Sequence, residues 1–295
     1  MLEDLKLARR YDGLLFLAES ARNVPKMESH HHVELELNLV VQGTIAYVVN
    51  GRRWTFPPRT LLWLFPQQEH QLVARSDDAQ YFVAVFKPTL IARSCRTPAY
   101  QGLKFDGSQQ DGVLNTRLDP VSFDLVRKTM ESLMQGSLDP DVLNREAGFG
   151  VASDFSFAHG DPDGLNAGLH YLLLLCWRSR HTGSVLGNVV ALHPKVRCAL
   201  KLLSEEREED LGKISRSCGV SEAFLSRTFH RQVGVALSDY RNSLRLTRFW
   251  ERYRQQDEKS LLKAAYAAGF GSYAQFYRVF AKAYGRGPRQ CIADR

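Results

Sequence analysis

Three histidines and one glutamate near the N-terminus have the types and spacing of metal ligands. His30 and His32 are two residues apart, Glu36 follows four residues after His32, and His70 lies further along the chain. Imidazole nitrogens combined with a carboxylate suit Zn, Fe, Mn, Ni or Cu. If this stretch is a strand, residues two apart share one face, so the two flanking histidines and Glu36 point inward and His31 points to solvent. The residues alone leave three interpretations: a metal site, an effector pocket, or histidines with satisfied hydrogen bonds at the rim of a barrel.

A second chemistry is indicated by a pattern that occurs twice near the C-terminus. The copies are offset by 51 residues from the serine onward, and by 50 at the turn glycine, because Gly271 is extra in the second copy. The matched positions are Gly219, Ser221, Leu225, Arg227, Phe229 and Gly234, and then Gly269, Ser272, Phe276, Arg278, Phe280 and Gly285. Each copy predicts a helix, a glycine turn and a second helix with a serine cap. Such tandem helix-turn-helix units indicate DNA binding.

The repeated polar positions fit contacts with a nucleic acid. Arg227 and Arg278 are suited to guanine or phosphate. Ser221 and Ser272 can cap their helices, and the N–H groups exposed at a helix start can hold a phosphate. The helix predicted over residues 236–253 is about 27 Å long, close to the roughly 34 Å between successive major-groove segments on one DNA face. One chain can therefore read two adjacent segments without a dimer.

The elements that must position the histidines are predicted to be strands. The segment from Val33 to Leu39 alternates apolar and polar residues, which is typical of a half-buried strand. Asn50-Gly51 is a tight-hairpin signal. Further strands are predicted over residues 44–49, 54–56, 60–65 and 81–86, which favours a small antiparallel barrel or double-sheet roll. Helices are predicted over residues 120–134 and 165–180, and the second is apolar enough to be buried against another element or another subunit.

Charge and cysteine content limit the class of protein. Residues 191–295 carry a net charge of +9 and the rest of the chain −2, so the C-terminal part is expected to meet a polyanion. The five cysteines are scattered, without a Cys-x-x-Cys pair, which argues against a zinc finger and against a disulfide framework and fits a reducing cytoplasm. The N-terminus has no signal-peptide pattern, and the apolar run over residues 171–177 is too short to span a bilayer. We expect a cytoplasmic protein that does not enter a membrane.

Residues from about 194 to 290 resemble the DNA-binding domain of AraC/XylS-type transcription regulators. The resemblance rests on the run from Ala264 to Phe270 and on the following positions Ser272, Phe276, Arg278, Phe280, Ala281, Lys282 and Gly285. Tyr277, Val279 and Gly287 differ from the usual pattern. The resemblance implies that bases are read by Ala223, Ser226, Arg227, Ala274, Gln275, Tyr277 and Arg278. With Ser221, Ser272 and Arg231, these residues form the candidate DNA-binding set.

The histidine region resembles another known pattern. The spacing His30-x-His32-x3-Glu36-x6-Gly43 is similar to the first motif of the cupin barrel, and Pro66-x3-His70 is similar to a shortened second motif. In cupins that bind metal, the matching residues converge as ligands. AraC-type regulators often keep such a barrel without metal and use it for a small effector.

Together these features predict an α+β protein. We expect a cupin-like antiparallel β-barrel over residues 1–90, a helical dimerisation and linker region over 91–190, and an all-α domain with two helix-turn-helix units over 191–295.

The predicted function is sequence-specific transcription regulation, controlled by a small-molecule effector. Expected partners are double-stranded DNA, a second copy of the chain and RNA polymerase. No enzymatic activity and no obligatory cofactor are expected, with a divalent metal in the barrel as an alternative. The competing hypotheses are a metal-dependent cupin enzyme or metal sensor fused to the DNA-binding domain, and a constitutive DNA-binding scaffold.

Overall fold

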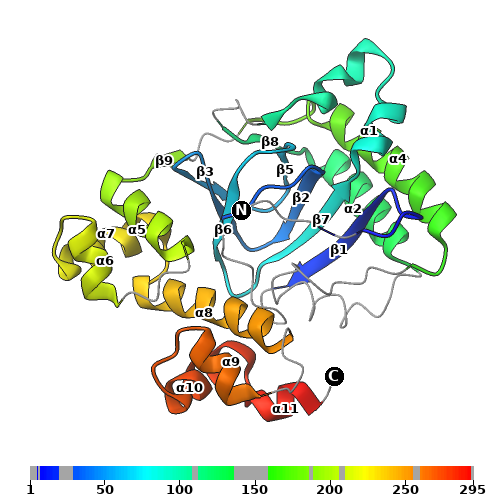
Figure 1. Cartoon of the computed structure of the whole chain (residues 1–295). Coiled ribbons are helices and arrows are strands. Elements are labelled where there is room, and N and C mark those ends of the chain that lie inside the picture. The colour runs from blue at the N-terminus through cyan, green and yellow to red at the C-terminus, as the bar shows by residue number, and fades with distance from the viewer. Residues whose placement is uncertain are drawn as a thin grey trace.

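The computed structural model describes residues 5, 7–19, 29–107, 112–135, 159–185, 189–205, 210–254 and 260–293. An N-terminal β domain lies in the middle of the molecule, with helices α2 and α4 on one side and the C-terminal helices on the other (Figure 1). This α+β arrangement confirms the predicted fold class. Among the described residues, no helix has the length and apolarity that crossing a membrane requires.

The β domain consists of two antiparallel sheets. Its strands are β1 (Gly13–Glu19), β2 (Leu35–Gln42), β3 (Ile45–Val49), β4 (Arg52–Phe56), β5 (Thr60–Leu64), β6 (His70–Arg75), β7 (Gln80–Phe86), β8 (Leu114–Arg117) and β9 (Val189–Ala191). One sheet has the order β1-β7-β2-β5-β8 and the other the order β6-β3-β4-β9. The antiparallel prediction is confirmed. The described strands pair in two separate open sheets, which agrees with the predicted double-sheet roll and not with a closed barrel.

Strand β2 shows why alternation alone was misleading. Its polar residues Glu36 and Asn38 were expected on a solvent face, or inward only as ligands, yet both are buried. β2 is the central strand of its sheet, between β7 and β5. Glu36 reaches toward His70 on the other sheet. The polar face of β2 therefore lies between the sheets, while Leu35 and Leu37 belong to the main hydrophobic core.

Local turn and cap signals are confirmed. Asn50 and Gly51 have φ values of 50° and 69°, the left-handed conformation that a tight hairpin between β3 and β4 requires. Helix α2 (Pro120–Met134) begins at Asp119, whose carboxylate accepts hydrogen bonds from the N–H groups of Val121 and Ser122. The sequence signals at these two places were sufficient because each involves only neighbouring residues.

Helix α4 (Pro162–Ser179) is covered within the chain. Its leucines and Trp177 join the same core as the strands, as do residues of α1 (Pro88–Ser94), η1 (Pro98–Lys104) and α2. Its apolar circumference therefore does not require a second subunit. The stretch expected to be a linker contributes strand β9, which pairs with β4 and leads directly into the C-terminal helices.

The C-terminal part is helical, as predicted. It contains α5 (Pro194–Ser204), α6 (Leu211–Ser217), α7 (Glu222–Val233), α8 (Leu237–Arg254), α9 (Leu261–Ala267), α10 (Tyr273–Tyr284) and α11 (Pro288–Ala293). Helix α8 belongs to two hydrophobic clusters. Leu237 and Leu244 pack with α5–α7, whereas Phe249 and Trp250 pack with α9–α11. The two helix-turn-helix units thus have separate cores joined by one helix.

Candidate functional site

The first helix-turn-helix unit has the predicted turn and caps. Gly219 between α6 and α7 has a φ of 68°, and Gly234 after α7 has a φ of 88°. Ser221 caps α7, since its Oγ accepts a hydrogen bond from the N–H of Phe224 at 3.2 Å. Leu225 and Phe229 are completely buried and fix the helix on its core.

The second unit repeats this design and adds one contact. Ser272 Oγ accepts from the N–H of Gln275 at 3.1 Å, and Gln275 Oε1 accepts from the N–H of Gly271 at 3.0 Å. Ser272 thus caps α10, and the Gln275 side chain binds the backbone one residue before this cap. Gln275 therefore holds the turn that the extra glycine lengthens, besides being a predicted base contact.

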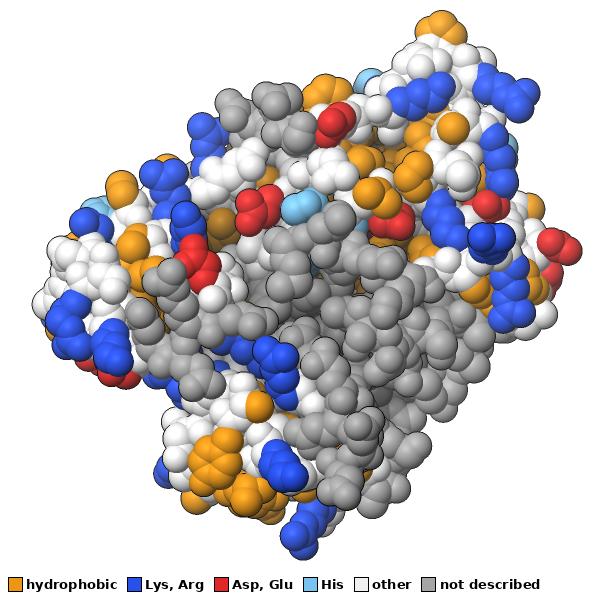
Figure 2. All heavy atoms as spheres, in the orientation of Figure 1, with side chains coloured by type: hydrophobic (Ala, Val, Ile, Leu, Met, Phe, Trp, Pro, Cys, Tyr) orange, Lys and Arg blue, Asp and Glu red, His pale blue; other side chains and the backbone are white. Residues whose placement is uncertain are grey.

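The candidate DNA-binding residues lie on the open side of both units. Ser221, Ala223, Arg227, Arg231, Ser272, Ala274, Tyr277 and Arg278 are exposed, and Ser226 and Gln275 are half-buried. Each set lies on or at the start of one helix, α7 or α10, opposite buried anchors. Figure 2 shows lysine and arginine side chains distributed over the C-terminal part of the molecule. Both predicted sets are thus accessible to a nucleic acid, but DNA contact by these residues stays a prediction.

Two departures from the family pattern are coupled. A Cβ atom at Gly287 would lie 2.9 Å from the hydroxyl oxygen and 3.1 Å from a ring carbon of Tyr277. No side chain fits there unless the tyrosine moves. The glycine that replaces the usual serine or threonine therefore makes space for the bulky Tyr277 of α10.

The first unit packs directly on the β domain. Ala46 of β3 and Val73 of β6 belong to the same hydrophobic cluster as Leu225 and Phe229. Across this contact the Gln71 amide donates a hydrogen bond to the hydroxyl of Tyr240 on α8. By contrast, the cluster of the second unit contains only residues from α8 onward.

The scattered cysteines were expected to be core residues without a disulfide framework, but one pair is bonded. Cys198 of α5 and Cys218 at the end of α6 are disulfide-bonded, with Cα atoms 5.8 Å apart. Their separation of 20 residues gave no signal, because the pairing depends on how α5 packs against the α6 turn. Cys95, Cys176 and Cys291 are free and buried, as expected of core residues.

The structure brings the four predicted N-terminal site residues together. Ligand atoms of His30, His32 and His70 all lie within 4.8 Å of one another. His32 Nε2 is 3.2 Å from Glu36 Oε2, and His70 Nε2 is 3.8 Å from the same oxygen. His32, Glu36 and His70 are buried between the sheets. We call these four residues the histidine cluster.

The convergence has a different cause from the predicted one. His30 and His32 precede β2 and are not part of a continuous strand with Glu36. Instead, the backbone of His30 pairs with that of His70 in an isolated bridge, through N–H···O bonds of 3.1 and 2.9 Å. His31 is half-buried rather than fully turned to solvent. Pairing with β6, which the sequence did not reveal as a strand, therefore builds the histidine cluster.

Burial sets the charge state of the histidine cluster. Burial lowers the pKa of His70 to about 3, so this imidazole is neutral at physiological pH. Burial alone would raise the pKa of Glu36, but hydrogen bonds with His32 and Asn38 and the nearby imidazoles lower it to about 2. The cluster thus holds a buried carboxylate beside a neutral histidine.

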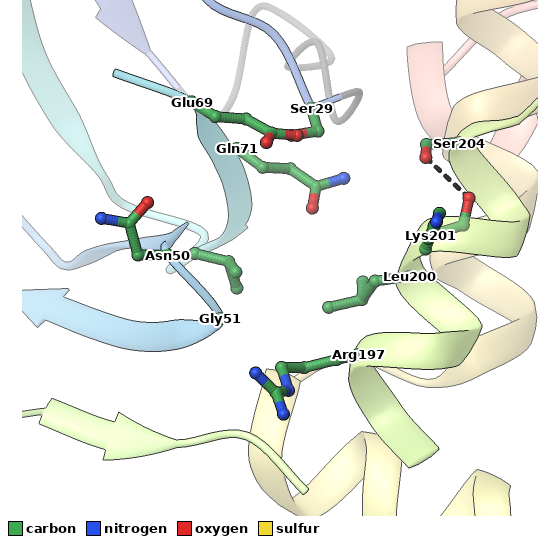
Figure 3. Close-up of a pocket in the computed structure, with 10 residues that line it drawn as sticks. Ser29, Asn50, Gly51, Glu69, Gln71, Arg197, Leu200, Lys201 and Ser204 are labelled. Atoms are coloured by element: carbon green, nitrogen blue, oxygen red, sulfur yellow. Dashed lines mark hydrogen bonds between the residues drawn. The ribbon is translucent and has the colours of Figure 1, made fainter. Parts of the chain in front are cut away.

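A cavity lies between the β domain and α5. Figure 3 shows side chains of the β domain facing Arg197, Leu200 and Lys201 of α5 across it, and its volume is about 350 Å³. Ser29 and Glu69, the neighbours of His30 and His70, line the β-domain wall. The cavity therefore borders the histidine cluster and both domains.

Sequence reasoning missed three residues of these sites. Asn38 donates a hydrogen bond to Glu36 Oε1 at 2.7 Å, and Gln71 and Tyr240 connect the two domains. Asn38 could have been found, since it is two residues from Glu36 on the same strand face. The Gln71–Tyr240 contact joins residues 169 positions apart and has no local signal.

Comparison with known families agrees with this architecture. The chain matches the family model of the AraC-like ligand binding domain over residues 15–135 and that of a helix-turn-helix domain over residues 214–293. No curated protein matches it significantly.

Solved structures of two regulators match the chain at low similarity. ToxT from Vibrio cholerae is 11% identical, with 95% of this chain and 98% of that chain covered and a TM-score of 0.33. Its complex with an unsaturated fatty acid gives 12% identity, 94% coverage of both chains and a TM-score of 0.33. The AraC-like transcriptional activator CuxR is 11% identical, with coverages of 89% and 83% and a TM-score of 0.32.

Proposed function

The chain belongs to the AraC-type transcription regulators, and on this premise we propose that it binds specific DNA sites under the control of a small-molecule effector. The observation that carries the DNA-binding part is the pair of exposed helices α7 and α10, each with an arginine at the same position. Two cores on one continuous helix support simultaneous contact with successive major-groove segments. The net charge of +9 over residues 191–295 supports a polyanionic partner.

The DNA-binding proposal is tested with the purified full chain and a site selected from random duplexes. We expect Arg227→Ala and Arg278→Ala each to lower the affinity for the selected site by about 10- to 100-fold, equivalent to 1–3 kcal/mol per base contact. Arg96→Ala is the matched control, because Arg96 is an exposed arginine in the β domain. Unchanged affinity in the double variant Arg227→Ala/Arg278→Ala would contradict the proposal.

The effector part of the proposal concerns the cavity between the domains. A ligand there would contact β-domain loops and α5 together, so it would favour one arrangement of the two domains over others. Its volume of about 350 Å³ suits a small molecule. A library screened by thermal shift on the wild type and on Leu200→Trp, which fills the cavity, tests this assignment. Ligands that stabilise both proteins equally would place effector binding elsewhere.

The proposal includes a homodimer and contact with RNA polymerase at the promoter, and so a cytoplasmic site of action. Val121 and Leu125 are exposed apolar side chains one turn apart on α2, and they support self-association. Sedimentation velocity of the wild type and Leu125→Glu measures it. We propose a binding role and no catalysis for the N-terminal domain, because its family model is that of a ligand binding domain.

A further inference from the structure

Two histidines in the histidine cluster face the same carboxylate oxygen. His32 Nδ1 is 3.0 Å from the backbone oxygen of Glu34, and His70 Nδ1 is 2.8 Å from that of Gln68. A carbonyl oxygen only accepts hydrogen bonds, so each Nδ1 carries the proton. Both Nε2 atoms face Glu36 Oε2, that of His32 in a hydrogen bond of 3.2 Å and that of His70 at 3.8 Å.

One nitrogen of this arrangement differs from the others. Glu36 Oε2 is hydrogen-bonded to His32 Nε2 at 3.2 Å, and Glu36 Oε1 accepts from Asn38. Among the described residues, no hydrogen-bond partner reaches the buried His70 Nε2. A buried imidazole nitrogen without a partner, beside a buried carboxylate and two further imidazoles, is an environment that a bound cation stabilises.

His30 completes a set of three imidazoles. Its ring centroid is 4.3 Å from that of His70 and 6.1 Å from that of His32. The paired backbones of His30 and His70 fix both residues at the edge of β6. The two Nδ1 hydrogen bonds orient the rings in the way that carbonyl partners orient metal-binding histidines.

We propose that His30, His32 and His70, with Glu36, bind one divalent transition-metal ion in the β domain. Zn–N bonds of about 2.0–2.1 Å place tetrahedral ligands roughly 3.4 Å apart, so the imidazoles must close by about an ångström. The donors favour Zn, Ni, Co or Cu over Mg or Ca, which prefer oxygen ligands. The proposal goes beyond the small-molecule effector, because the ion occupies the space between the sheets and not the cavity next to α5.

The position of the site on β6 connects it to the DNA-binding domain. Successive strand residues point to opposite faces, so His70 faces the histidine cluster and Gln71 faces α8, where it contacts Tyr240. The Tyr240 ring packs edge-to-face on Phe229 of α7 at 5.3 Å. Occupancy of the site should therefore change the DNA affinity of the first unit, and this second step rests on the proposed DNA-binding function.

Metal binding is measured first, without DNA. The full chain, prepared without a polyhistidine tag and stripped with chelator, is titrated with ZnCl2 by calorimetry and with CoCl2 by visible absorption. We expect one ion per chain and a Co(II) spectrum without a thiolate charge-transfer band. No binding, or binding of thiolate character, would overturn the proposal.

Variants locate the site. His30→Ala is the safer ligand variant because His30 is half-buried, and His70→Gln tests the buried position. Each should lower the affinity for the ion by more than the roughly 10- to 100-fold that loss of an outer-shell partner costs. His31→Ala is the matched control for the histidine run and should bind as the wild type does. Equal affinity for the metal ion in all three variants would overturn the assignment. Circular dichroism verifies that each variant is folded.

The connection to DNA is tested separately. Saturating Zn is expected to change the affinity for the selected DNA site at least fivefold, the lower end of typical allosteric coupling. Gln71→Leu should keep the metal affinity and remove most of this change. If the protein binds zinc but its DNA affinity does not change, the coupling is overturned and the metal site stands. If the protein binds no specific DNA site at all, the proposed function is overturned and the metal result stands.

Discussion

The two helix-turn-helix units have the same local design and different surroundings. Both have a left-handed glycine turn, a serine cap and two buried anchors on the second helix. The first unit shares its core with β3 and β6 of the β domain and has a disulfide beside its turn. The second has a core of its own, in which Phe249, Phe276 and Phe280 are in ring contact. A repeated sequence pattern thus determines the hairpin, while the rest of the chain determines what each hairpin packs against.

The largest effect should come from removing the matched anchors. Phe229→Ala and Phe280→Ala each delete a fully buried ring and should lower the free energy of unfolding by about 3–5 kcal/mol. Because the first core continues into the sheet, Phe229→Ala should also increase hydrogen exchange in β3 and β6. Phe280→Ala should affect only α8 to α11. If hydrogen exchange increased only in the helices in both variants, the first unit would be as independent of the β domain as the second.

Reduction of the disulfide should distinguish the units next. A bridge between residues 20 apart stabilises by about 3 kcal/mol, and the position equivalent to Cys218 in the second unit is Ala268. Thermal unfolding with and without reductant should therefore show a lower midpoint for the first unit when reduced. The difference should disappear in Cys218→Ala and persist in Cys291→Ala, which removes a free thiol from the second core. A reductant effect that persists in Cys218→Ala would contradict this prediction.

A smaller effect is expected from the space beside Tyr277 in the second unit. Gly287→Ala places a methyl group against the tyrosine and should displace its exposed ring, weakening DNA binding by several-fold with little loss of stability. Gly271→Ala is the matched control, since its Cβ would meet only Gln275 Oε1, at 3.6 Å. Electrophoretic mobility shifts on the selected site measure both variants. Equal affinities would mean that Tyr277 does not contact DNA.

The smallest expected effect is a pH dependence confined to the first unit. Asp210 caps α6, and the hydrogen bond from the Lys213 backbone lowers its pKa below the ordinary 3.8. Its stabilising contribution is complete above that ordinary value and is lost as pH falls through the lowered pKa. Ser260 caps α9 and does not titrate in this range. Hydrogen exchange on acidification should therefore rise in α6 before α9, and Asp210→Asn should remove the difference because asparagine still caps.

The parts of the fold that sequence predicted are those fixed by near neighbours. The Asn50-Gly51 hairpin, the Asp119 cap of α2 and both glycine turns of the helix-turn-helix units were evident from residue type and spacing. Strands β1, β6, β8 and β9 were missed, and the sequence left a barrel and a double-sheet roll as alternatives. β9 pairs with β4 across more than a hundred residues of chain and β1 pairs with β7 across more than sixty, so neither pairing has a local signal.

The candidate site follows the same rule. The members of the histidine cluster were predicted correctly as a group, because motif spacing marked them, but the predicted strand alternation was not what brings them together. His70 meets His30 through a two-residue bridge that no periodicity reveals. The contact between Gln71 and Tyr240 was likewise beyond reach, since only domain packing creates it.

The length of helix α8 also fixes the angle by which α7 and α10 are rotated relative to each other about the axis of α8. Because its N-terminal half belongs to one core and its C-terminal half to the other, a single inserted residue would turn the second unit by about 100° and advance it by about 1.5 Å. An insertion of seven residues would nearly restore the angle but add about 10 Å, roughly three base pairs of DNA. Under the proposed DNA-binding function, the length of α8 therefore sets both the separation and the relative orientation of α7 and α10.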